Sequence, residues 1–185
     1  GGEWIETRLL SSGPRTNPWF RECSMRPIER DDLVSFDTDL IGPYGYCSDI
    51  SRAWLCGDRP NDEQRRLYAA AYEQIETNIA VLGPGLSFRE VSQRCWKIPK
   101  AYLSQRYPSL MHGVGLADEY PSIKHWVDFE AKAYEGVLQP GMVLCVESFI
   151  GVEGGREGVK LEEQVIITET GTERMSSYPF EVDWL

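Results

Sequence analysis

The chain has 185 residues, of which 42% are hydrophobic and 26% are charged, a composition typical of one globular domain. Its 29 acidic and 19 basic residues give a net charge of −10, which argues against a nucleic-acid or anionic membrane surface. No apolar run approaches the roughly 20 residues of a membrane span. We therefore expect no nucleic-acid partner and no membrane partner.

The ends and the cysteines indicate the setting of the chain. It begins at Gly1 without Met and shows no signal-peptide pattern, so we expect a piece of a longer protein. The five cysteines are odd in number and form no Cys-x-x-Cys pair. This usage predicts free thiols in a reducing cytoplasm.

The first half of the chain predicts strands and turns. Residues 3–10 alternate loosely and are expected to form a strand. Residues 33–40 predict a second strand, which carries Asp37 and Asp39 on one face because they are two positions apart. Residues 46–54 predict the returning strand of a hairpin, and Asp49 lies on it.

Two helices and two strands follow. Asn61 is a candidate cap for a helix from Asp62 to about Leu82, and Ser87 with Glu90 forms a capping-box pattern for a helix to about Ile98. Residues 142–150 and 159–168 predict two long strands. The order of elements predicts an α+β domain with helices on one face of a mainly antiparallel sheet.

Several acidic residues lie where acids are disfavoured. Glu147 and Glu162 interrupt apolar strands, and Asp37 follows Phe36. Each carboxylate could point to solvent or pair with Lys or Arg, because a buried and unpaired one is costly. Carboxylates from separate strands could instead gather around a cation.

Together with His112, five carboxylates would make a site for two divalent ions. Two such ions would leave one net negative charge, and a mixed oxygen and nitrogen donor set suits Fe, Mn or Zn. The five acidic residues are Asp37, Asp39, Asp49, Glu147 and Glu162.

The motifs of the chain resemble those of a known superfamily, the creatinase/aminopeptidase P or "pita-bread" enzymes. The resemblance covers about residue 9 to residue 170. The resemblance implies a pita-bread fold, with a curved, mainly antiparallel sheet and helices on its outer face. It also implies that residues 1–185 are the metal-binding C-terminal catalytic domain of a homodimer. The segments that carry it are Asp37-Thr-Asp39, Gly45-Tyr-Cys-Ser-Asp49, His112-Gly-Val-Gly-Leu116, Gly141-Met-Val with Glu147, and Gly158-Val-Lys-Leu-Glu162.

The chain departs from the peptidases of that superfamily in three ways. Asp39 and Asp49 are ten positions apart, where peptidases usually have eleven. Asp118 stands where peptidases have a second His, and Trp19 stands where they have a third. His125 matches neither position, and we interpret it as a surface or packing residue.

Asp37 also adds a third acid before Asp39 and Asp49. This triple acid, together with Asp118 and Trp19, resembles one branch, the dimethylsulfoniopropionate lyases of the DddP type, which release dimethyl sulfide and acrylate. That resemblance implies two divalent metal ions, with iron favoured and Zn, Mn or Ni as alternatives. It implies Asp118 as the catalytic base and Tyr107 as a pocket residue. The implied metal ligands are Asp37, Asp39, Asp49, His112, Glu147 and Glu162.

The residue types suit an elimination on a small zwitterionic sulfonium. Metal ions would stabilise the charge that develops on the substrate carboxylate, while Asp118 removes the neighbouring proton. A sulfonium favours aromatic faces, for which Tyr107 and Trp19 are candidates, although either ring could simply pack in the core. Two alternatives remain open: a dinuclear metallopeptidase of the aminopeptidase P or prolidase type, and a pita-bread module that binds without catalysis.

Overall fold

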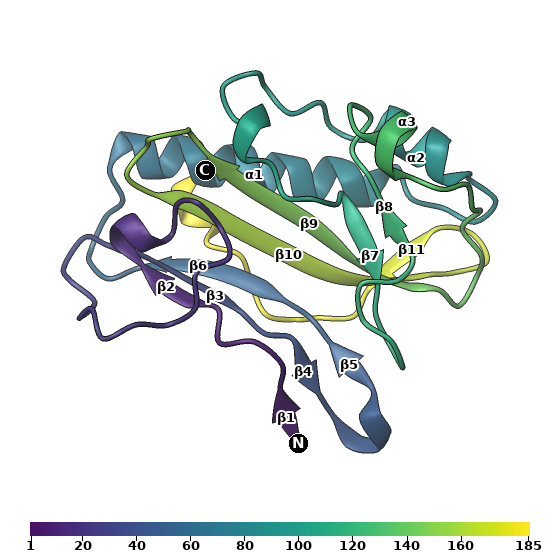
Figure 1. Ribbon diagram of the computed structural model, residues 1–185, viewed down its shortest axis with the longest axis horizontal. Helices are drawn as coiled ribbons and strands as arrows, with labels where there is room; N and C mark the ends of the chain where they lie inside the picture. The colour runs from purple at the N-terminus through teal and green to yellow at the C-terminus, as the bar shows by residue number, and fades with distance from the viewer.

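The computed structural model describes residues 1–185, and its largest element is a five-stranded antiparallel sheet (Figure 1). The strand order is β11-β10-β9-β7-β8, so the long β9–β10 hairpin lies in the middle. The expected long strands are therefore confirmed as its central pair. The strands are β7 (Met111–Gly113), β8 (Ser122–Ile123), β9 (Val143–Gly151), β10 (Gly158–Ile167) and β11 (Thr172–Arg174).

Two three-stranded antiparallel sheets come from the first 55 residues, in the orders β2-β3-β6 and β1-β4-β5. The strands expected over 3–10, 33–40 and 46–54 are each divided in two, because the chain changes pairing partners along each segment. Thr38 N still donates to Ile50 O across the break. The strands are β1 (Trp4–Ile5), β2 (Leu10–Ser12), β3 (Leu33–Asp37), β4 (Leu40–Ile41), β5 (Cys47–Ser48) and β6 (Ser51–Leu55).

Both predicted helices are present, and capping boxes begin them. The helix α1 (Asp62–Ala80) starts after Asn61, whose side chain accepts hydrogen bonds from two backbone N–H groups. The helix α2 (Phe88–Arg94) starts after Ser87 but ends before the expected Ile98. The backbone becomes extended at Cys95, and the next N–H, that of Trp96, donates to a side chain of α1.

Shorter helical segments complete the fold. A one-turn helix, α3 (Phe129–Lys132), was not predicted from the sequence. No helix is both long and apolar enough to cross a membrane. Four 3-10 turns span Gly13–Arg15, Pro43–Gly45, Leu103–Gln105 and Val182–Trp184.

The central hairpin is covered on both sides. Figure 1 shows the helices along one face of the five-stranded sheet and the β2-β3-β6 sheet on the other. Leu144, Val146 and Leu161 are fully buried, and Ser148 on β9 donates a 2.8 Å hydrogen bond to Gln74 of α1. The α+β class, with antiparallel sheets and helices on one face, is confirmed, and the polar side chains discussed next lie between the sheets.

Candidate metal centre

The acidic residues on the strands are buried rather than solvated. Asp37, Asp49, Glu147 and Glu162 are between 0% and 3% exposed, and Asp39 is half-buried. Of the two ordinary alternatives, orientation toward solvent is therefore wrong for those four. The remaining alternatives are pairing with a basic side chain and binding to a cation.

Strand register places the acids on one face. Glu147 of β9 lies opposite Glu162 of β10, and His112 of β7 lies opposite Cys145 of β9. Alternate residues of a strand point to the same side, so Cys145 and Glu147 share the face that looks away from α1. Three strands thus direct an imidazole, a thiol and two carboxylates into one space.

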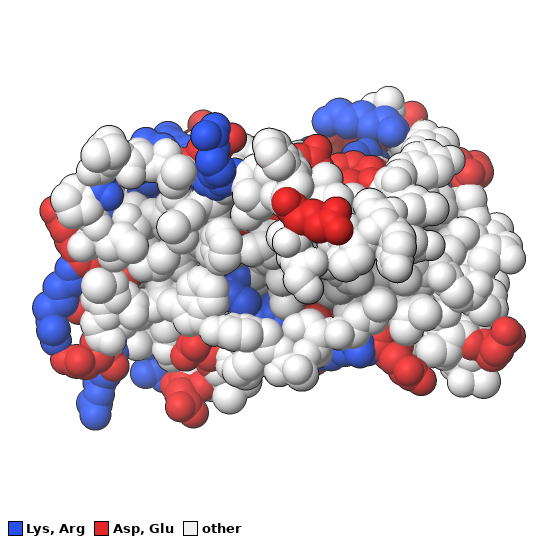
Figure 2. All heavy atoms as spheres, turned by 90° about the horizontal axis from the view of Figure 1, so that it is seen from below, with Lys and Arg blue, Asp and Glu red and all other residues white.

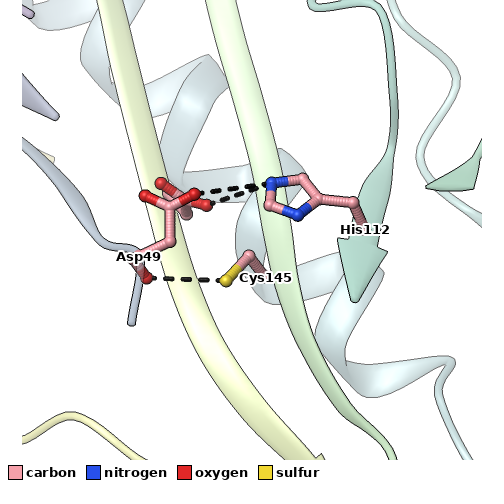
Figure 3. Close-up of side chains that lie close together, drawn as sticks. Asp49, His112 and Cys145 are labelled. Carbon is pink, nitrogen blue, oxygen red and sulfur yellow. Dashed lines mark hydrogen bonds and ion pairs between the residues drawn. The ribbon is translucent and has the colours of Figure 1, made fainter. Parts of the chain in front are cut away.

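The other candidate ligands come from the end of β3 and from the segment between β3 and β6. Ligand atoms of Asp37, Asp39 and Asp49 lie within 4.8 Å of one another, and so do those of Asp49, His112, Cys145 and Glu162. Asp49 belongs to both groups. Figure 3 shows its carboxylate directed toward the imidazole and its backbone oxygen directed toward the Cys145 sulfur. The six residues expected as metal ligands are thus brought together, although their role as ligands stays a prediction.

His112 lies at the centre of the acidic groups. Its Nε2 is 3.1 Å from Glu147 Oε1 and 3.5 Å from Asp49 Oδ2. Burial lowers the pKa of this imidazole, but the Glu147 hydrogen bond and nearby carboxylates outweigh burial and raise it to about 10. Without metal, the ring is therefore expected to be an imidazolium that partly balances the acids.

The carboxylates strongly disfavour being charged together. Burial and like charges raise the pKa of Asp37 to about 7, and they also raise those of Asp49 and Glu162. Asp49 Oδ1 and Glu162 Oε1 are buried without a hydrogen-bond partner. Unpartnered buried oxygens among crowded acids are the donor set that a hard or borderline divalent ion needs, so the residues fit a metal.

One basic residue of this cluster was missed from the sequence. Lys160 of β10 is completely buried, and its Nζ lies 2.6 Å from Glu147 Oε2 and 3.4 Å from Glu162 Oε2. Its position two residues before Glu162 on one strand was the available signal, because such residues share a face.

Two hydroxyl groups support the acids. Ser51 Oγ donates to Asp37 and lies 3.0 Å from Glu162 Oε2, so it bridges the two sheets. Thr7 Oγ1 donates a 2.8 Å hydrogen bond to Asp39. Neither hydroxyl has a sequence signal, because both contacts join distant parts of the chain.

Asp118, the expected base, lies beside the cluster rather than within it. Its Oδ1 is 3.6 Å from His112 Nδ1, on the side of the ring opposite the acids around Nε2. Burial raises the pKa of this carboxyl group, which is partly countered by His112. The neighbouring Glu119 is exposed, and its Oε1 is 3.9 Å from His112 Nε2. Asp118 thus remains free of the ligand groups.

The two aromatic candidates form a buried cluster with Leu9 and Phe149. Lys160 Nζ lies 5.3 Å from the ring centre of Trp19 and 4.7 Å from that of Tyr107. Phe20 stacks on Tyr107 at 5.7 Å, and a cavity of about 190 Å³ is lined by these three rings. The rings of Trp19 and Tyr107 therefore contact Lys160 of the acidic cluster and also line a cavity.

The remaining histidine packs inside the protein. His125 is 1% exposed, so of the two expected roles the packing role is the observed one. Burial, with a contribution from the charge of Arg106, lowers its pKa to about 4. The two histidines of the chain thus have opposite electrostatic surroundings.

Comparison with known proteins identifies the family. The model of "Metallopeptidase family M24" matches residues 1–169. The chain belongs to this family. The M24 chain is 51% identical over 182 residues to dimethylsulfoniopropionate lyase DddP of Roseovarius nubinhibens, a match that covers 98% of this chain and 41% of that protein. It is 33% identical over 171 residues to Xaa-Pro dipeptidase of Pyrococcus furiosus, covering 91% of this chain and 46% of that protein.

Solved structures agree with this assignment. Prolidase from Pyrococcus furiosus superimposes with a TM-score of 0.84 at 32% identity, covering 97% of this chain and 51% of that one. The expected pita-bread fold is confirmed for the M24 chain, and the acidic cluster in a metallopeptidase family indicates divalent metal binding. The chain spans about two fifths of the length of the lyases that it matches.

Proposed function

We propose that the complete protein is a metal-dependent carbon–sulfur lyase that cleaves dimethylsulfoniopropionate to dimethyl sulfide and acrylate. The observation that carries this proposal is a carboxylate at position 118, placed against the metal-site histidine but outside the ligand groups. An identity of about half to two lyases over 98% of the chain supports the same reaction.

Two neighbouring ligand groups support two divalent ions, of which we favour iron. One group contains Asp37, Asp39 and Asp49, and the other contains Asp49, His112 and Glu162, with Glu147 beside the imidazole. Their shared member, Asp49, would be available to both ions. When bound, the ions would supply Lewis-acid stabilisation of negative charge on the substrate carboxylate.

Asp118 performs the proton transfer in this proposal. Its carboxylate takes the proton from the carbon next to the substrate carboxylate, and the electrons of that C–H bond form the new C=C bond. The C–S bond breaks and its electron pair leaves with sulfur, which gives neutral dimethyl sulfide. A carboxyl pKa raised by burial makes Asp118 a better base than a solvated aspartate.

The aromatic rings serve the sulfonium end of the substrate. Trp19 and Tyr107 are buried next to the acidic cluster and also line the adjoining cavity. A positively charged sulfur is attracted to aromatic faces. The ammonium of Lys160 already lies against both rings, so the sulfonium would take their cavity side. In this proposal these two rings hold the sulfonium end of the substrate.

We further propose a homodimer in the cytoplasm. Figure 2 shows the lower face of the molecule, on which residues other than Asp, Glu, Lys and Arg cover wide areas on either side of a central acidic side chain. Trp4 on β1 is exposed, and so are Tyr44 and Tyr46 in the turn between β4 and β5. Exposed aromatic rings close to one another in the fold favour a subunit interface. All five cysteines are free, which agrees with a reducing compartment.

The test uses the complete natural chain reconstituted with Fe²⁺. It is given dimethylsulfoniopropionate, and headspace dimethyl sulfide is measured beside cleavage of a panel of proline-containing peptides. We expect gas release, and we expect Asp118→Asn to lower it by about 10²- to 10⁴-fold while bound metal is unchanged. Asp58→Asn, at an exposed ion pair with Arg30, is the matched control and should leave the rate unchanged.

The other outcomes decide between the remaining functions. Peptide cleavage without gas would contradict the lyase and favour a peptidase. Bound metal without either reaction would favour a binding module. Full gas release by Asp118→Asn would contradict the role of Asp118 as the base, and the lyase proposal itself would stand.

A further inference from the structure

Lys160 holds a position that no ligand role explains. Besides the two glutamates, its Nζ lies 3.4 Å from Asp37 Oδ2 and donates a 2.8 Å hydrogen bond to Ser51 Oγ. These partners belong to β3 and β6 of one sheet and to β9 and β10 of the other. One ammonium group thus connects the two sheets at the acidic cluster.

The ammonium of Lys160 is shielded from solvent, and the nearby arginine is paired elsewhere. Its side chain is 0% exposed, and its Nζ lies over the rings of Trp19 and Tyr107. The other buried cation nearby, Arg52, pairs instead with Glu163 at 2.8 Å. Lys160 is therefore the lysine or arginine that faces the ligand carboxylates.

Charge counting gives this lysine a specific role. When all are ionised, as metal binding requires, the five candidate ligand carboxylates carry five negative charges. Two divalent ions would neutralise four of them, and the ammonium of Lys160 neutralises the fifth. A buried centre is most stable when its charges balance, because uncompensated charge in a low-dielectric interior is costly.

We propose that Lys160 is a permanent third cation of the metal centre. It holds acids of both sheets together before metal binds, and it makes the centre neutral when two divalent ions are present. It does not bind the ions, and it repels them, so the protein gives up some metal affinity in exchange for an ordered metal-free site. This inference rests on the two-metal part of the proposed function and not on the substrate.

Lys160→Met tests this role, because Met preserves length and apolar contacts but removes the charge. Melting temperatures are measured in the complete natural chain without metal and with Mn²⁺, and Mn²⁺ binding is measured by calorimetry. Without metal we expect the variant to melt about 10 °C lower, since its acids have lost the ammonium and keep only the imidazolium of His112 as a buried cation. We expect Mn²⁺ to bind at least about tenfold more tightly, since a repelling charge is gone. The gain in melting temperature on adding Mn²⁺ should therefore exceed that of the wild type.

Two variants serve as controls. Lys160→Arg keeps the charge and should resemble the wild type in both the metal-free melting temperature and the Mn²⁺ affinity. Lys132→Met removes an exposed lysine that pairs with Asp128, and it should change neither quantity.

Each outcome has a distinct meaning. Equal or weaker Mn²⁺ binding by Lys160→Met would overturn the inference and leave Lys160 as a packing residue. If that variant is unfolded without metal, recovery of its circular dichroism on adding Mn²⁺ supports the inference, and failure to recover contradicts it. Absence of Mn²⁺ binding in the wild type would overturn the two-metal centre itself, and the inference with it.

Discussion

On the side of β9 and β10 that faces α1, Leu144 and Leu161 are fully buried; on the opposite side, Glu147, Lys160 and Glu162 are buried just as deeply. The same two strands thus have an apolar core on one face and a buried charged cluster on the other. The apolar one is stabilised by removal of hydrocarbon from water, at roughly 25 cal/mol per Å². The stability of the charged side depends on how many cations neutralise its carboxylates.

This difference shows how the fold separates stability from function. Packing against α1 fixes the position of both strands without any ligand, and that position brings the acids together. The charged side then accepts metal in a frame that the apolar side maintains. The effect of a change on the charged side should consequently depend on metal, and the effect of a change on the apolar side should not.

Removal of metal should have the largest effect. A metal at about a thousand times its dissociation constant contributes about 4 kcal/mol, so a chelator is expected to lower the melting temperature by roughly 10 °C. Calorimetry with and without chelator measures this shift. Adding metal back should restore the original value, and an unchanged melting curve would contradict a structural role for bound ions.

Truncation on the apolar side should cost slightly less and be independent of metal. Leu161→Ala removes a fully buried side chain and is expected to lower the free energy of unfolding by about 3 kcal/mol. The loss should be the same in metal-free and metal-loaded protein, as measured by urea denaturation. A loss confined to one form would show that the two sides are coupled, contrary to this account.

His125 is expected to make the stability of the protein depend on pH. The pKa of His125 is about 4 in the folded protein, below its ordinary value of 6.5. The unfolded chain therefore binds an extra proton between those values, so stability is complete above pH 6.5 and falls as the pH drops toward 4. The loss should approach about 3 kcal/mol.

His125→Phe isolates this contribution, since it removes the titrating group from a buried position. Urea denaturation of metal-loaded protein from pH 7 to pH 4 should show a flatter dependence in the variant than in the wild type. Identical slopes would mean that His125 does not supply the pH dependence.

The smallest expected effect lies at the start of α1, the helix that covers the apolar side. Asn61→Ala removes the side-chain acceptor for the N–H groups of Glu63 and Gln64 and should cost about 1 kcal/mol. Asn61→Asp keeps the acceptor and should remain close to the wild type in thermal unfolding. Equal losses in both variants would argue against capping as the cause.

The parts of the fold that follow local rules could be predicted from the sequence. Capping residues gave the starts of α1 and α2, and long apolar runs gave β9 and β10. The end of α2 and the division of the early strands could not be predicted, because both depend on partners far away in the chain. Trp96, for example, bonds to Asn78 of α1.

The sequence indicated the candidate site through acids inside apolar strands. It did not indicate the buried lysine that balances their charge. Glu147 and Glu162 were noticed because they interrupt apolar strands. Lys160 lies in the same kind of strand, yet a lysine has a long side chain that often reaches solvent. Its spacing from Glu162 places it on the same face, and the pairing of β9 with β10 then shows that its ammonium remains inside, against Glu147.

The most direct test of the account is the number of metal ions per chain after reconstitution with Fe²⁺ or Mn²⁺, measured by mass spectrometry of the metal content. The account predicts two ions per chain in the wild type, and fewer in Glu147→Gln, which loses a buried charge beside His112. A folded wild-type protein that retains no ions would contradict it.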